Sequence, residues 1–429
     1  MIRNIEHITK SLIDERMPQW FNTLRIQGLS RFIETGIPAV SDPNWKYTDL
    51  EALKKLAFDV SENGELNEWE LLNQFRNHKD INIVLLNGAF SVKHSDLDNL
   101  EKGVLVSTLH EAVKNNAPHI QERLTKYPMT DTAAFIALNQ ALNGPGVYIL
   151  VDEKVVSNRL IHIIHVTHPG RQNFASMPRT LIVMEPFSEA AIFESHVAFG
   201  DSRTYFSNAL TDIFMNENAT LHYCKSQKES LKAFHIGHTR VWQERDSSFD
   251  GFSFMAGGRL TRNNVDAVLN GEGANARLNA FYSVNNSQHV DNHTSIEHRV
   301  PNCASNQLYK GILNDSARAV FNGRILVRPE AQKTNSYQLN KNLLLGSGCR
   351  VDTKPQLEIF ADDVKCTHGA TIGQLDEDEM FYLQTRGIGK NAASRMLAEG
   401  FLSDLLNTVK NAAVREKLNS LTRRSFEAS

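Results

Sequence analysis

The sequence predicts a mainly β protein built around a solenoid, with helical regions at both ends. Between about residues 146 and 375 the chain is a succession of short, β-rich, alternating segments separated by Asn, Gly, Asp and Ser. Nothing between these segments is long or periodic enough for crossover helices, which excludes a doubly wound sheet or a TIM barrel. One phrase also recurs, in which polar turn residues precede a small residue and then alternating apolar positions.

The recurring phrase indicates structural repetition. It reads SEAAIFESH, NENATLHYC, GEGANARLNAF, NDSARAVFNG and ADDVKCTHG, beginning at residues 188, 216, 271, 314 and 361. The spacings are irregular, at roughly one to two solenoid coils each. A solenoid explains so large an all-β region better than one sandwich, which would be smaller. A pair of sandwiches remains the alternative.

Before residue 146 the chain is mixed but mostly helical, and we expect an N-terminal domain over 1–145. Apolar residues recur at helical spacing up to about residue 36, and Asp49 can cap a short helix that begins near Leu50. The next elements expected are a helix over 65–75, a buried strand over 81–90 with an Asn-Gly turn, a strand and helix over 104–116, and a helix over 132–142. The breaker Asn143-Gly144-Pro145-Gly146 closes this domain.

After the β core, which we expect over 146–375, the chain becomes helical over 376–429. A first helix begins with the acids near Asp376, favourable at a helix N-terminus, and ends at Gly387. The segment 390–410 predicts one amphipathic helix, and a shorter apolar stripe follows it. Such an appendage can cap the open end of a solenoid or dock a partner, and the two roles are compatible.

Composition narrows the class of protein. The chain has 429 residues, 41% hydrophobic and 22% charged, with a net charge of -3, so no nucleic-acid surface is indicated. No apolar run approaches the roughly 18 residues of a membrane helix. The first residues, MIRNIEHITKSLIDER, lack the apolar centre of a secretory signal and contain acids that transit peptides avoid. We therefore expect a cytoplasmic protein that does not bind membranes.

Catalytic motifs are missing from the sequence. It contains no Walker A motif, no G-x-S-x-G elbow and no H-E-x-x-H, so the chain is not expected to hydrolyse nucleotides by itself. Its four cysteines are far apart and form no C-x-x-C pair, so reduced thiols are expected. Cys224 and Cys303 are interpreted as small buried hydrophobic residues.

Several histidines cluster in the β region, and we interpret them as structural. His162, His165 and His168 alternate between strand faces, so they cannot converge on one metal ion. A second group resembles a metal site in composition, but its spacing matches no zinc or di-iron signature; it comprises His289, His293, His298, Asp291 and Glu297. His235 and His238 are treated in the same way.

The stretch from Ala361 to Ile388 holds the strongest candidate site. If it begins as a strand, Cys366 and His368 point to the same face. A thiolate and an imidazole are suitable ligands for iron or zinc. Two ligands are too few for a closed site, so other residues converge here or a second chain completes it. The alternative is a buried cysteine and a capping histidine in an ordinary strand.

Three segments resemble the SufB/SufD family of scaffold subunits of the SufBCD iron–sulfur cluster assembly complex: WKYTDL (45–50), VDNHTSIEH (290–298) and ADDVKCTHGATIGQLDEDEMFYLQTRGI (361–388). SufB-like chains carry His-Glu-Ala where this chain has His368-Gly369-Ala370, which favours the SufD branch. The resemblance implies a right-handed parallel β-helix between two helical domains. It also implies a non-ATPase scaffold that pairs with SufB through the β-helix and docks the SufC ATPase on its C-terminal helices.

The resemblance also implies site residues. Cys366 and His368 match the interface cysteine and histidine of the family, and Cys349 is a third candidate. A transient iron–sulfur cluster is expected at the interface with SufB, and no permanent cofactor in the isolated chain. The residues expected to dock SufC are Phe381, Tyr382, Arg386, Gly387, Met396 and Phe401.

Two other functions stay open. The chain could be a purely structural partner that stabilises SufB and recruits SufC without ligating anything. It could also be a β-helix enzyme acting on polysaccharide, although the cytoplasmic composition argues against this. Exposed solenoid edges are consistent with a homodimer when the chain is isolated.

Overall fold

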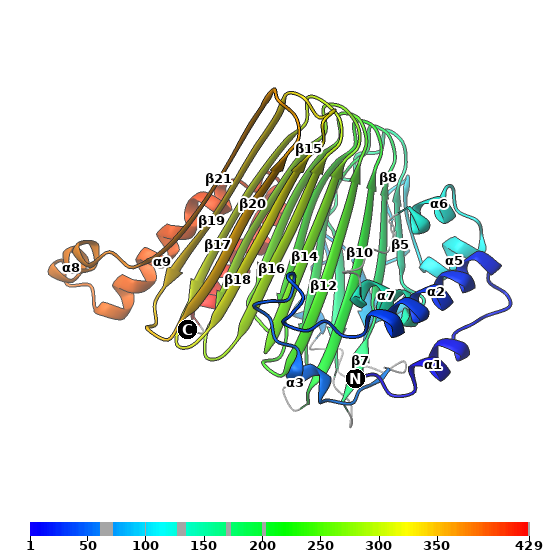
Figure 1. Ribbon diagram of the computed structural model, residues 1–429, viewed down its shortest axis with the longest axis horizontal. Coiled ribbons are helices and arrows are strands. Elements are labelled where there is room, and N and C mark those ends of the chain that lie inside the picture. Colours follow the sequence, from blue (N-terminus) through cyan, green and yellow to red (C-terminus); the bar gives the residue numbers. More distant parts are fainter. Residues whose placement is uncertain (61–71, 99, 127–133, 169–172, 200–202, 428–429) are drawn as a thin grey trace.

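The computed structural model confirms the parallel β-solenoid with helices at both ends (Figure 1). It describes residues 1–60, 72–98, 100–126, 134–168, 173–199 and 203–427. The chain alternates between two large sheets, so that each coil adds one strand to each sheet. The solenoid has about seven coils. The alternative of paired sandwiches is wrong, because successive strands within each sheet are parallel and one coil apart.

Sheet 1 is the larger of the two. From the C-terminal end its main path runs through β20 (Arg350–Ile359), β18 (Arg318–Val327), β16 (His289–His298), β14 (Leu260–Leu269), β12 (Ala233–Gln243), β10 (Tyr205–Met215), β8 (Arg179–Met184), β5 (Val147–Val151) and β4 (Val104–Ser107). The short strands β1 (Asp59–Val60) and β7 (Phe174–Ser176) lie off this path.

Sheet 2 faces sheet 1 across the solenoid interior. Its order is β21 (Val364–Gln374), β19 (Thr334–Leu344), β17 (Ala304–Leu313), β15 (Asn275–Val284), β13 (Ser248–Met255), β11 (Thr220–Lys228), β9 (Glu189–Ala198), β6 (Ile161–Thr167), β2 (Ile81–Leu86) and β3 (Ala89–Phe90). The hairpin of β2 and β3 is antiparallel and contains the expected Asn-Gly turn at Asn87-Gly88.

The recurring phrase of the sequence lies at corners of the coil, before strands of both sheets. At several of these corners the residue that precedes the small residue has a left-handed backbone, which Asn, Asp and Gly tolerate best. The left-handed residues are Asn218, Asp246, Gly273, Asn286 and Asp315, with φ between 51° and 77°. After Asn218 and Gly273 the small residue is a fully buried alanine, and after Asp315 a serine precedes the fully buried Ala317. The polar-then-small pattern therefore marks where the chain turns from one sheet into the other.

Alternation along the strands fills the interior. One continuous apolar cluster runs through the coils, and Ile163, Ile192, Tyr282 and Phe321 are among its fully buried members. Burying such a side chain stabilises the fold by about 1.5–3 kcal/mol relative to leaving it exposed. Each coil thus holds the next by apolar stacking inside and by backbone hydrogen bonds along the strands.

Helices of the first 145 residues cover the outer face of sheet 1. They are α1 (Ile5–Ser11), α2 (Gln19–Thr35), α3 (Glu51–Lys54), α5 (Leu109–Lys114), α6 (Ile120–Thr125) and α7 (Ala134–Leu142). The 3-10 helix η1 (Val92–His94) instead contacts β2 of sheet 2. Helices α2 and α7 cross closely at Gly28, where an added Cβ would lie 2.8 Å from the Ala137 carbonyl oxygen. Phe135 of α7 packs on Phe206 of β10.

The strands of these first residues belong to the solenoid. β2 pairs in parallel with β6, and β4 pairs antiparallel with β5. Most of the helix expected over 65–75 lies outside the described residues. The boundary expected at residue 146 stays a prediction.

Two of the segments behind the family resemblance contact each other. Thr48 donates a 2.5 Å hydrogen bond to Asp291 on the outer face of β16. Arg262 of β14 donates to the same carboxylate at 2.7 Å and to the Asn44 carbonyl oxygen at 2.8 Å. The Arg262 guanidinium also lies 3.8 Å from the centre of the Trp45 ring. WKYTDL and VDNHTSIEH therefore form a buried structural contact that holds the N-terminal region on sheet 1.

The C-terminal helices do not cap the open end of the solenoid. Helices α9 (Lys390–Asn407) and α10 (Ala412–Glu427) lie across the outer face of sheet 2, while α8 (Glu377–Thr385) projects away from the body (Figure 1). Leu402 and Leu405 of α9 are buried in one cluster with Phe281 and Ile312 of the sheet. The capping expectation is therefore wrong in the described part of the chain, because these apolar side chains have a sheet face to cover.

No helix in the described ranges is both long and apolar enough to cross a membrane.

Substitution Asp291→Ala is expected to destabilise the protein by about 3–5 kcal/mol, because it leaves the buried Arg262 guanidinium without its carboxylate. Urea unfolding followed by circular dichroism measures this loss. The control is Asp59→Ala, which removes an exposed ion pair with Arg3 and should cost less than about 1 kcal/mol. Equal losses in the two variants would contradict the role assigned to Asp291.

Substitution Leu402→Ala is expected to cost about 2–5 kcal/mol, because it opens a cavity between α9 and sheet 2. Met396→Ala, on the same helix, should change stability by less than about 0.5 kcal/mol, because Met396 is 48% exposed. Thermal unfolding of both variants compares them. Similar melting temperatures would mean that α9 does not depend on this contact.

Candidate functional site

Cys366 and His368 lie on β21, the last strand of sheet 2. They are two residues apart in one strand, and pair in register with Ser336 and Gln338 of β19. Cys366 packs against a small interior cluster that contains Ile325 and Val327, so this face of β21 is the interior face. Both candidate ligands therefore stand at the open end of the solenoid interior.

The two side chains differ in exposure. Cys366 is half-buried, and burial raises the pKa of its thiol above the ordinary value. His368 is exposed. Behind Cys366, the hydroxyls of Ser336 and Ser305 are 2.8 Å apart and fully enclosed. The open end thus presents an accessible imidazole beside a thiol that is partly sheltered.

The structure does not bring Cys349 to this pair. Cys349 precedes β20, whereas Cys366 is near the start of β21, on the return path of the coil. The ten residues of β20, which span about 33 Å, lie between Cys349 and the turn into β21, so the two thiols are far apart. Cys349 is half-buried, and its thiol lies 3.7 Å from the Asp315 carbonyl oxygen. Within the described ranges, no third metal-binding side chain joins Cys366 and His368.

The residues expected to dock an ATPase fall into two groups. Helix α8 has no buried residue, and Phe381 and Tyr382 are 69% and 57% exposed. Arg386 lies over the Tyr382 ring, and Gly387 ends the helix with φ 81°. Together with the exposed Met396 these form the accessible group.

Phe401 belongs to the second group. Its carbonyl oxygen accepts a 2.5 Å hydrogen bond from Lys310 of β17, and its ring lies 4.6 Å from the same ammonium. Lys310 also pairs with Asp404. Phe401 is thus part of the contact between α9 and sheet 2 rather than of an exposed surface.

The acidic residues around β21 have structural positions. Asp376 caps α8, since its carboxylate accepts hydrogen bonds from the backbone of Asp378 and Glu379. Asp362 and Asp363 are exposed in the turn before β21. These carboxylates therefore give no support to a polysaccharide-cleaving site.

The histidine interpretations are confirmed in part. His162 points outward and contacts the Ser195 hydroxyl at 2.7 Å, whereas His165 points inward, so the expected alternation holds. His293 lies 3.1 Å from the Asp291 carboxylate. His298 is enclosed in the interior, where it contacts Ser305 at 2.9 Å. These positions fit structural roles.

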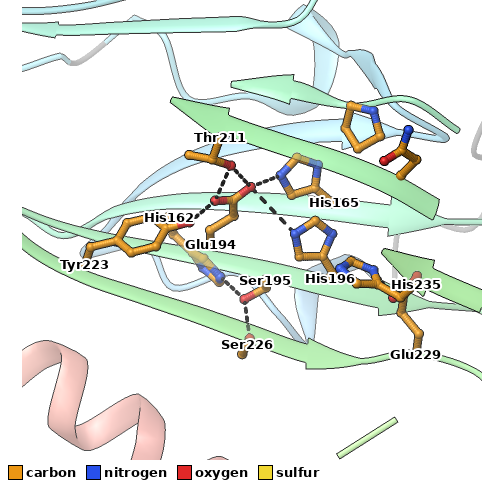
Figure 2. A network of polar contacts seen from close by, with 12 residues as sticks. His162, His165, Glu194, Ser195, His196, Thr211, Tyr223, Ser226, Glu229 and His235 are labelled. Atoms are coloured by element: carbon orange, nitrogen blue, oxygen red, sulfur yellow. Dashed lines mark hydrogen bonds and ion pairs between the residues drawn. The ribbon is translucent and has the colours of Figure 1, made fainter. Parts of the chain in front are cut away.

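His165 has a partner that the sequence interpretation missed. Its Nε2 lies 2.7 Å from Oε1 of Glu194, and Nε2 of His196 lies 3.6 Å from the same oxygen (Figure 2). In the described part of the chain, these three residues are the one group whose metal-binding atoms all lie within 4.8 Å. The signal was present in Glu194-Ser195-His196, which places a carboxylate and an imidazole on one strand face. The neighbouring strand that completes the group could not be assigned.

The electrostatics of this group follow from burial. Burial raises the pKa of Glu194, but the hydrogen bond with His165 and the nearby His196 imidazole outweigh burial and hold this pKa well below its ordinary value. Burial, and then the neighbouring His165, lower the pKa of His196. Glu194 Oε2 accepts hydrogen bonds from Tyr223 and Thr211. The group therefore contains an ionised carboxylate beside a neutral imidazole.

Comparison with known proteins shows which family this chain belongs to. The family profile described as "SUF system FeS cluster assembly, SufBD core domain" matches residues 166–401, and that of the SufBD protein N-terminal region matches residues 6–163. These two matches define the class of the protein, that of the iron–sulfur cluster assembly proteins. The chain belongs to the SufBD family of iron–sulfur cluster assembly proteins.

Individual relatives agree with this assignment. The chain is 32% identical to an iron–sulfur cluster assembly SufBD family protein of Synechocystis, over 89% of this chain and 86% of the relative. It is 30% identical to the iron–sulfur cluster assembly protein SufD of Escherichia coli, over 91% and 90%. It is 29% identical to the chloroplastic protein ABCI7 of Arabidopsis thaliana, over 92% and 84%. The family resemblance drawn from three short segments is therefore confirmed along most of the chain.

Proposed function

We propose that the chain is a non-ATPase scaffold subunit that pairs through the open end of its solenoid with a SufB-type partner. A nascent iron–sulfur cluster, which is cargo rather than a resident cofactor, is assembled at that interface. The observation that carries this proposal is the position of Cys366 and His368 on the interior face of the last coil.

The open end is suited to pairing with a second chain. In the described part of the chain, β20 and β21 are the last strands of the two sheets. A terminal strand has backbone groups without a neighbouring strand, which favours edge-to-edge association. Apolar side chains are also exposed there, including Phe360 at 62% and Ile372 at 48%. A second solenoid would bury these side chains and continue both sheets; in isolation a second copy could do the same.

Half a site at an interface suits assembly and release. Cys366 and His368 offer two ligands, and the partner would supply the others. Moving the chains apart then removes ligands from the cluster without unfolding either chain. Neutral imidazole can bind iron, whereas protonated imidazole cannot, so a histidine ligand can also release the iron.

The C-terminal helices are suited to transmit such a movement. We propose that a SufC-type ATPase docks on α8, whose Phe381 and Tyr382 are exposed. Helix α9 anchors α8 to the sheet through Leu402 and Leu405. Closure of two ATPase subunits, driven by ATP hydrolysis, would then move this sheet and its last strand.

A purely structural partner role is the second candidate. It is favoured by the isolation of Cys366 and His368 from further ligands within the described ranges.

We also propose that the protein is cytoplasmic, although the name of the Arabidopsis relative places that protein in the chloroplast.

Substitution His368→Ala is expected to preserve folding and complex formation. It should reduce cluster formation at least about 10-fold, because it removes a proposed ligand of the cluster. The complex is purified without oxygen with SufB-type and SufC-type partners, and iron, sulfide and visible absorption are measured after reconstitution. Thr367→Ala is the control, because Thr367 is exposed on the opposite face of β21.

Two outcomes would contradict the assignment of His368. Undiminished cluster yield in the His368→Ala complex would mean that His368 is not a ligand of the cluster. Loss of the complex itself on size-exclusion chromatography would favour the purely structural role.

Combined substitution of Phe381 and Tyr382 by Ala is expected to weaken binding of the SufC-type ATPase at least about 30-fold, because exposed aromatic side chains are frequent hot spots. Calorimetry measures the affinity, and stability should not change. Ile26→Ala, which removes a side chain that is 52% exposed on the distant helix α2, is the control. Unchanged affinity would place the ATPase elsewhere.

A further inference from the structure

We infer that His165, Glu194 and His196 form a binding site for one divalent first-row transition-metal ion inside the solenoid. The site lies between β6 and β9 of sheet 2, many coils away from β21. It is therefore separate from the half-site at the open end, and the inference does not depend on the proposed function.

The register of the strands brings the donors together. His165 and His196 are direct neighbours in the parallel ladder of β6 and β9, and their rings stack with centres 4.3 Å apart. Both Nε2 atoms face Oε1 of Glu194, at 2.7 and 3.6 Å (Figure 2). An ion about 2.0–2.2 Å from each donor needs donors roughly 3–4 Å apart, so a small tilt of the rings admits it.

The donor set selects the kind of ion. Two imidazoles and one carboxylate, with further positions open, are the ligands of non-haem iron(II), and zinc(II) accepts the same set. Calcium and magnesium prefer oxygen ligands and are disfavoured by two nitrogens. The site is thus suited to a borderline transition-metal ion.

Orphaned polar atoms supply an independent observation. The three residues are 6%, 0% and 2% exposed, yet His196 Nε2 has no hydrogen-bond partner. A buried polar atom without a partner costs about 1–3 kcal/mol. The neighbouring interior positions Ile163 and Ile192 are apolar, so the coil could have been filled without any polar group. A metal ion would satisfy the orphaned atom.

The surroundings hold the carboxylate in place. Tyr223 donates a hydrogen bond to Glu194 Oε2, and the Thr211 hydroxyl lies 3.0 Å from Oε2 and 3.2 Å from Oε1, so the carboxylate is fixed with Oε1 directed at the histidines. Such partners around a ligand orient it for the metal.

Cobalt(II) titration tests the inference. The full chain carrying Cys366→Ser and His368→Ala, which removes the half-site at the open end, is stripped with EDTA and titrated with Co²⁺, then with Fe²⁺ without oxygen. We expect one ion per chain, a ligand-field spectrum and a raised melting temperature. Adding Glu194→Gln or His196→Gln should weaken binding at least about 100-fold, whereas His298→Gln, at an interior histidine outside the group, should not change it.

Two results would overturn the inference. One is failure of the parent chain to bind Co²⁺ or Fe²⁺ stoichiometrically, which would mean that buried water, and not a metal ion, contacts the unpaired polar atoms. The other is equal binding by the parent and the Glu194→Gln chain. If the Gln variants do not fold, pulsed EPR of the Cu²⁺-loaded parent decides, because the site predicts two coordinated imidazoles. One imidazole or none would exclude it.

Discussion

The parallel hydrogen-bond ladder between successive coils is the constraint on which the rest of this structure depends. Each strand satisfies its backbone groups with the strands one coil before and after it, so the last coil has no neighbour on one side. In this chain β20 and β21 are left in that position, and the C-terminal helices cover a sheet face instead. The same ladder that stabilises the core therefore creates the surface on which Cys366 and His368 lie.

The ladder also decides what the interior contains. Strict register places the same position of each coil above the next, so apolar residues form long stacks. A polar residue that enters such a stack must find its partner in a neighbouring coil. Ser305 with Ser336, and His165 with Glu194, are two such pairs. Polar interior groups are thus concentrated in clusters. The free-energy cost of burying them is reduced only where neighbouring coils supply hydrogen-bonding partners.

Local sequence patterns predicted the class of fold and the common orientation of Cys366 and His368. Alternation in 361–374 placed Cys366 and His368 on one face, because side-chain direction in a strand depends only on its period of two. The polar-then-small phrase was informative since the coil corner requires a left-handed residue. Neither pattern contains the coil length, which varies, so neighbours one coil apart could not be assigned. For this reason the group of His165, Glu194 and His196 was missed.

The residues alone therefore establish strands, turns, helices and the direction of each side chain within its strand, because these depend on neighbours in the chain. Tertiary structure decided which coils stack, that α9 covers sheet 2, and that Thr48 and Arg262 meet at Asp291. It also separated Cys349 from Cys366 and left α8 exposed. These outcomes depend on contacts between residues far apart in the chain, whose free energies are gained only when the whole solenoid has formed.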